Sequence, residues 1–249
     1  MISAPDLQGV VDRRLLLNFR VDPEIARRLV PAPFRPNLSR GAAIAGICVI
    51  RLTELRPSGV PRALGIRSES AAHRFAVEWD SDDGEGHGVY IPRRDTDSRL
   101  GVLLGGRAFP GVHHHASFHV RETPASYDID LRSPDPAAPV SVRATGTDAL
   151  PAGSIFRDLA DASEFFRADR VGYSPSLRRD RYDGLELETE HWAVDPLQVE
   201  YIRSAFFDDP ASFPPGSVTF DCALAMRRTR ARWRARPPLP ALVPSRGHG

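Results

Sequence analysis

Residues 15–31, LLLNFRVDPEIARRLVP, join a strand pattern to a helix pattern with a sharp boundary between them. Residues 15–21 are apolar and rich in residues that favour strands. Asp22 is a good N-cap residue, and Pro23 suits the first position of a helix because its missing N–H group is not needed there. Pro31 cannot continue a helix. The stretch therefore predicts a strand followed at once by a short helix.

Strand patterns dominate the rest of the chain. Residues 41–55 predict a buried strand, and residues 73–80 and 88–95 flank a Gly/Asp-rich loop that is typical of a hairpin. Short helices are predicted from Thr96 or Asp97 onwards and over residues 154–167. Many antiparallel strands, few helices and no long linker favour a single α+β domain around a curved sheet or barrel.

The bulk composition is that of an ordinary globular protein. The chain has 249 residues, 41% of them hydrophobic and 26% charged, with a formal net charge of +1. Because no global field favours polyanions, neither nucleic acid nor a membrane is expected as a partner. Cys48 and Cys222 lie far apart in apolar runs, which indicates buried thiols in a reducing compartment. Without a signal-peptide or membrane-spanning pattern, a cytoplasmic location is predicted.

All 33 basic residues are arginine, and lysine does not occur. Coding bias is the simplest explanation of this composition. Its chemical consequence is that no side-chain amine is available to form a Schiff base. No nucleotide-binding signature is present either, so no organic cofactor is expected.

The stretch AFPGVHHHASFHV, residues 108–120, contains half of the eight histidines. If it is one strand, His113, His115 and His119 share one face, and His114 lies on the other face with apolar neighbours. The first face could hold a metal ion, but no ligand spacing demands one, so an exposed polar face is favoured. His114 would lie beside the core or a cavity.

Four blocks resemble the acetoacetate-decarboxylase-like superfamily, and more closely its uncharacterised YqjF-like branch. They are NFRVDPEIARRLVPAPFRP (18–36), GVYIPRRDTDSRLGVLLGGRAFPGVHHHASF (88–118), GLELETEHW (184–192) and FDCALAMRRTRARW (220–233). The resemblance covers residues 10–233 and implies an antiparallel, cone-like β-barrel that encloses a pocket. Residues 234–249 are rich in Pro and Arg and are expected to form a disordered tail.

The resemblance also implies site residues. Residues 19–22 match a Tyr-Arg-Thr-Asp block of the decarboxylases, which makes Arg20 a candidate for binding a carboxylate. The pocket glutamate of the decarboxylases falls between Glu69 and Arg74, both of which become candidates for ligand binding. The Schiff-base lysine and its lysine neighbour fall on His114 and His115.

An imidazole cannot form the iminium that such a decarboxylation requires, so classical acetoacetate decarboxylase chemistry is excluded. The favoured interpretation is a barrel that binds a small anionic ligand such as a carboxylic or keto acid, and assembly into a homo-oligomer is left open. One alternative is a lyase, isomerase or hydrolase with His114 and His115 as general acid and base. Another is a metal-dependent enzyme that uses His113, His115 and His119. At the level of sequence these alternatives stay open, including whether the protein is an enzyme.

Overall fold

The computed structural model describes residues 5–81, 84–107 and 109–241. The strands are β1 (Leu7–Val21), β2 (Arg35–Pro36), β3 (Leu38–Ser39), β4 (Ala42–Pro57), β5 (Ile66–Ser81), β6 (Gly84–Thr96), β7 (His114–His115), β8 (Ser117–Glu122), β9 (Ser126–Arg132), β10 (Val140–Gly146), β11 (Val171–Pro175), β12 (Arg181–Thr189), β13 (Asp195–Ser204) and β14 (Val218–Pro240). The helices are α1 (Pro23–Leu29), the 3₁₀ helix η1 (Arg62–Leu64), α2 (Arg99–Leu104) and α3 (Leu159–Ala168).

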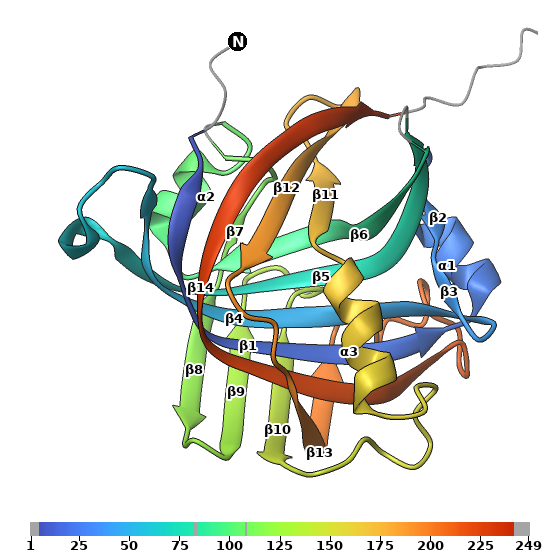
Figure 1. Cartoon of the computed structure of the whole chain (residues 1–249). Coiled ribbons are helices and arrows are strands. Elements are labelled where there is room, and N and C mark those ends of the chain that lie inside the picture. Colours follow the sequence, from blue (N-terminus) through green and yellow to red (C-terminus); the bar gives the residue numbers. More distant parts are fainter. Residues whose placement is uncertain (1–4, 82–83, 108, 242–249) are drawn as a thin grey trace, which may run out of the picture.

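The long strands close into a ring (Figure 1). The order of hydrogen-bonded neighbours is β1-β4-β5-β6-β11-β12-β14, and β14 returns to β1. Strand β14 closes the ring because its first part pairs with β1 and its last part, residues 231–240, pairs with β12. All these pairings are antiparallel except β6 with β11. The predicted single α+β domain, built on a cone-like ring of mostly antiparallel strands, is confirmed.

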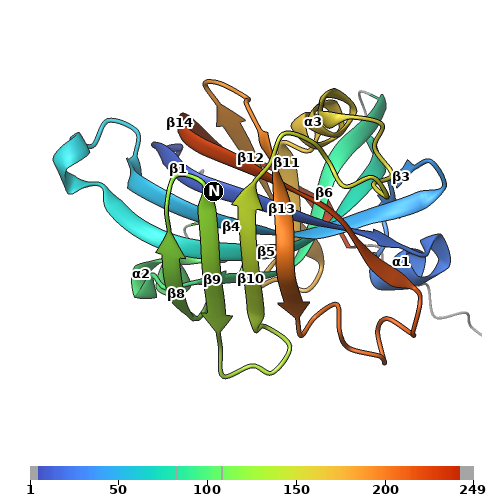
Figure 2. The same ribbon diagram turned by 90° about the horizontal axis from the view of Figure 1, so that it is seen from below.

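A second group of strands lies across the outside of the ring. Strands β13, β10, β9 and β8 continue the sheet from β14 and cross the strands β1, β4 and β5 (Figure 2). The alternation along β1 produces two separate cores, since successive side chains of a strand point to opposite faces. Leu15 and Leu17 pack between the ring and the second group, whereas Leu16 packs inside the ring.

The helices are short and locally specified. Asp22 caps α1 as predicted, because its Oδ1 accepts hydrogen bonds from the N–H groups of Glu24 and Ile25. Helix α3 begins at Leu159 rather than at residue 154. The reason is that Asp221 of β14 binds the Ser154 hydroxyl and the N–H group of residue 155, which holds this segment outside the helix. Within the described residues, no helix has the length and apolar character needed to cross a membrane.

The predicted disordered tail is wrong for its first part. Residues 234–240 belong to β14, where Arg236 pairs with Gly184 and Leu239 pairs with Tyr182. The register shifts between these two pairs, at the position of two prolines. A bulge tolerates proline because the missing N–H groups are not needed for the ladder. The remaining tail, residues 242–249, lies outside the described residues.

Candidate functional site

A cavity of about 730 Å³ lies inside the ring. Every strand of the ring contributes to its wall, and α2, α3 and the segment after α2 complete it. Small side chains leave this space open, among them Ser70, Ala72 and Gly172. The volume falls in the range of ligand pockets, about 300–1,000 Å³.

Arg74 of β5 is the most deeply buried cation in the cavity wall. Its Nη2 donates a hydrogen bond of 2.6 Å to Asn18 Oδ1, and its Nε is buried without a partner within the described residues. The guanidinium also stacks on the ring of Phe166, 5.1 Å from the centroid. Gly46 lies opposite on β4, and a Cβ atom there would come within 2.5 Å of the Leu17 carbonyl oxygen. Burial lowers the pKa of Arg74, which means that its charge is under-solvated.

Arg94 of β6 presents a second guanidinium to the cavity. Its Nε donates to Ser174 Oγ at 2.8 Å, and no carboxylate pairs with it in the part of the chain that the structure describes. Desolvation lowers the pKa of Arg94 to about 10. A desolvated cation with no counter-ion attracts an anion from solution.

Asp169 is a buried carboxylate in the cavity wall, beside Arg74. It follows α3, and its Oδ2 lies 3.6 Å from Arg74 Nη1. Burial raises the pKa of Asp169 to about 7, although the charges of Arg74 and Arg14 act in the opposite direction. Arg14 of β1 also lines the cavity, donating to Cys48 Sγ at 3.4 Å. Of the three arginines, only Arg74 pairs with this carboxylate, which is only partly ionised at neutral pH.

His113 also lines the cavity. Its Nδ1 lies 3.0 Å from the Gly111 carbonyl oxygen, which assigns the proton to Nδ1 and leaves Nε2 as an acceptor. Burial and the charge of Arg94 lower the pKa of His113 to about 4. The imidazole is therefore neutral at pH 7 and polar without adding charge.

The structure does not place His114 and His115 in the cavity. Both are exposed, so the expectation that His114 shares a face with buried apolar neighbours is wrong. The reason is a change of partner strand at Ala116. Strand β7 pairs with β6, whereas β8 pairs with β9, so the alternation does not run through residues 113–120 as in one strand.

The same break separates the histidines of the metal alternative. His113 points to the cavity, whereas His115 and His119 are exposed on β7 and β8. Among the residues with described positions, no group of three His, Cys, Asp or Glu side chains is arranged to hold a metal ion. The proposed set His113, His115 and His119 does not form a centre.

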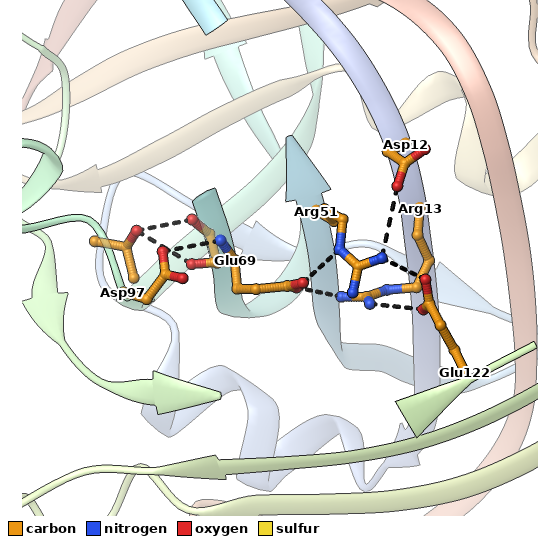
Figure 3. Close-up of polar contacts among 8 residues, drawn as sticks. Asp12, Arg13, Arg51, Glu69, Asp97 and Glu122 are labelled. Carbon is orange, nitrogen blue, oxygen red and sulfur yellow. Dashed lines mark hydrogen bonds and ion pairs between the residues drawn. The ribbon is translucent and has the colours of Figure 1, made fainter. Parts of the chain in front are cut away.

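Glu69 lies outside the cavity, in a buried ion cluster between the ring and β8 (Figure 3). Its carboxylate pairs with Arg13 and Arg51, each at 2.5 Å. Glu122 of β8 pairs with the same two arginines. Asp12 adds a third carboxylate, 3.6 Å from Arg51. Both arginines are therefore paired with carboxylates, and the arrangement links β8 to the ring rather than leaving a cation free for a ligand.

Arg20 is also occupied. Its Nε lies 3.1 Å from Asp221 Oδ1, and the residue does not line the cavity. Of the three candidates for ligand binding, only Arg74 faces the cavity.

Comparison with known proteins agrees with this architecture. The family model described as DUF2071, uncharacterized conserved protein, matches residues 11–219. The chain belongs to the DUF2071 family. No curated protein matches the sequence.

Solved structures show the fold of this DUF2071 protein. An acetoacetate decarboxylase-like enzyme from Sphingomonas wittichii RW1 has a TM-score of 0.63 at 13% identity, over 97% of this chain and 95% of that chain. The enduracididine biosynthesis enzyme MppR, complexed with pyruvate, gives 0.60 at 12% identity, over 97% and 92%. Acetoacetate decarboxylase from Legionella pneumophila subsp. pneumophila str. Philadelphia 1 gives 0.59 at 11% identity, over 95% and 88%. The resemblance inferred from the sequence blocks is confirmed.

Arg14, Arg94 and Asp169 were not predicted from the sequence. A signal existed for Asp169, which follows the buried Phe166 by nearly one helical turn. For Arg94 the alternation misleads, because Val89 and Ile91 point to Arg93 as the next residue on that face, and a register shift between β5 and β6 brings Arg94 to the cavity instead.

Proposed function

We propose that this DUF2071 protein binds a small organic anion, a carboxylic or keto acid, inside the ring. The observation that carries the proposal is Arg94, a desolvated guanidinium with one neutral partner, beside the under-solvated Arg74. A bound carboxylate would accept charge-assisted hydrogen bonds from both side chains. Pyruvate in complex with MppR, a protein of the same fold, supports this class of ligand. Since the sequence contains no lysine, the ligand is not processed through a Schiff base on a lysine side chain.

Asp169 supports a second candidate function, acid–base catalysis on the bound acid. A carboxyl group with a pKa of about 7 is suited to exchange a proton near neutral pH. In this alternative Asp169, rather than His114 and His115, is the general acid or base of a lyase, isomerase or hydrolase. Turnover that is lost in Asp169→Asn while binding persists would support it.

Arg94→Gln is expected to abolish binding. At a hundredfold excess over Kd, a ligand stabilises the wild-type protein by about 2.7 kcal/mol, and this gain should vanish in the variant. The ligand-free variant should change by no more than about 1 kcal/mol, because Arg94 loses a single hydrogen bond to Ser174. The measurement is a thermal-shift titration with a panel of short carboxylic and keto acids.

Arg20→Gln is the matched control for this experiment, because Arg20 pairs with Asp221 outside the cavity. It should keep the full ligand-induced shift. The proposal is wrong if Arg94→Gln keeps the ligand-induced shift, or if Arg20→Gln loses it to the same extent.

Binding is expected to weaken as the pH rises through about 7. Asp169 ionises in this range and then competes with the ligand carboxylate for Arg74. Above pH 7, ligand binding should therefore be coupled to the uptake of one proton by Asp169. The affinity should fall by up to about tenfold per pH unit. Isothermal titration calorimetry between pH 6 and 8 in two buffers of different ionisation enthalpy measures both effects. Asp169→Asn should remove the pH dependence, and a persistent dependence in this variant would assign it to another group.

A further inference from the structure

We propose that the anion carries an elongated apolar tail, so that the natural ligand is an amphipathic carboxylic acid rather than a small keto acid. The inference rests on the proposed function, since it places the carboxylate at Arg74 and Arg94. It adds that the tail runs from these arginines along β5 to a mouth beside η1 and α2.

The size of the cavity is the first argument. Liquid water occupies about 30 Å³ per molecule, so about 730 Å³ holds on the order of two dozen non-hydrogen atoms. A keto acid such as pyruvate would leave most of this space empty. Ligand pockets enclose most of the surface of what they bind, so the volume favours a larger ligand.

The shape of the cavity is the second argument. Five residues of β5 lie on one face and all line the cavity: Ile66, Ser68, Ser70, Ala72 and Arg74. At about 3.3 Å per residue, this row is about 26 Å long. Between its two ends the side chains are small, which leaves a continuous path. The space is therefore elongated, with the buried cation at one end.

The chemistry of the wall is the third argument. Ile50, Leu185 and Leu187 point into the ring, yet they are only partly buried because the cavity leaves them uncovered. Trp192 and Trp233 add aromatic surface to the same wall. An apolar wall that the protein itself does not cover is typical of a ligand site.

The mouth is apolar as well. Leu64 is 68% exposed, Leu100 is 48% exposed and Ile66 is 37% exposed, and all three line the cavity. Arg74 and Arg94 thus lie at the deep end, and the exposed apolar side chains lie at the solvent end. Arg56 also lines the cavity near the mouth, but its guanidinium already donates to the carbonyl oxygens of Glu54 and Val60. A ligand that matches both ends has its charge at the head and an apolar chain that reaches the mouth.

The test is a series of straight-chain carboxylates, from butyrate through octanoate and decanoate to hexadecanoate, titrated by calorimetry below their micelle concentrations. Each added methylene group that becomes buried should tighten binding about fourfold. Octanoate should therefore bind on the order of a hundredfold more tightly than butyrate. Octanol, which has the tail without the charge, should bind far more weakly than octanoate.

Two variants of α2 separate the mouth from the rest of the surface. Leu100→Asn should weaken hexadecanoate several-fold and leave butyrate unchanged, because only the longest chain approaches the mouth. Leu103→Asn is the matched control. Leu103 is 60% exposed on the same helix but does not line the cavity, so both acids should bind as in the wild type.

The outcomes distinguish the two proposals. If all acids bind with the same affinity, the apolar tail is wrong and the anion site stands. If octanol matches octanoate, or if no acid of any length binds, the anion site fails and the amphipathic ligand fails with it. Both proposals are supported if affinity rises with chain length, if Arg94→Gln and Leu100→Asn weaken binding, and if Leu103→Asn leaves it unchanged.

Discussion

Replacing Arg13 by methionine is expected to lower the free energy of unfolding by about 3 to 5 kcal/mol. Arg13 is fully buried and pairs with Glu69 at 2.5 Å and with Glu122 at 2.9 Å. Methionine fills a similar volume but leaves two carboxylates with Arg51 as their remaining basic partner in the cluster of Figure 3. A buried charge that loses its partner is far more costly than a surface pair that is broken.

Urea denaturation at pH 7 measures the effect. Arg35→Met is the matched control, because Arg35 pairs with Glu78, Asp80 and Glu85 on the surface, where its side chain is 45% exposed. This control should lose no more than about 1 kcal/mol. In the double variant Arg13→Met/Glu122→Gln part of the stability should return, because the unpaired charge is removed. Equal losses in Arg13→Met and Arg35→Met would mean that the buried cluster does not stabilise the fold.

The second large effect concerns acid stability, and it depends on His73. This residue of β5 is fully buried between the ring and the second group of strands, 4.8 Å from Phe206 between ring centroids. Neither of its ring nitrogens has a hydrogen-bond partner within the described residues. Burial and the charge of Arg93 lower the pKa of His73 to about 3. The folded protein therefore holds this imidazole neutral.

The unfolded chain binds the proton first as the pH falls, because its imidazole titrates near 6.5. The stability that neutral His73 provides is complete above pH 6.5 and is lost as the pH falls towards 3. The loss reaches about 4 kcal/mol, since one pKa unit corresponds to 1.36 kcal/mol. His73→Phe removes the titrating group and should remove this loss. At pH 7 the variant should be at least as stable as the wild type, because two unpaired buried nitrogens disappear.

Denaturation at several pH values between 7 and 4 measures the effect as the difference between wild type and variant. The difference isolates His73 from His113, which acts in the same direction, and from Asp169, which acts in the opposite direction. His73→Leu is a second variant, which removes the titrating group without the overpacking that the larger phenylalanine ring could cause. His87→Phe is the exposed control and should leave the pH profile unchanged. A profile that stays steep in both His73 variants would assign the acid sensitivity to other groups.

The sequence determined the features that depend on neighbouring residues. The helix α1 follows from Asp22, Pro23 and Pro31, which act within one or two turns of the chain. The hairpin of β5 and β6 follows from two apolar runs around a Gly/Asp-rich loop. The absence of lysine excludes a lysine Schiff base whatever the fold.

The tertiary structure decided which side chains meet. Period-two alternation predicts the face of a side chain only while a strand keeps its partner, and the change of partner at Ala116 therefore exposed His114 and His115 and left His113 in the cavity. Arg74 and Arg94 lie on neighbouring strands of the β5–β6 hairpin, and Asp169 reaches Arg74 from the end of α3, far away in the sequence. The cavity that these residues line is enclosed because β14 pairs with both β1 and β12. Closure joins residues far apart in the chain, so local patterns in the sequence do not reveal which side chains line the enclosed space.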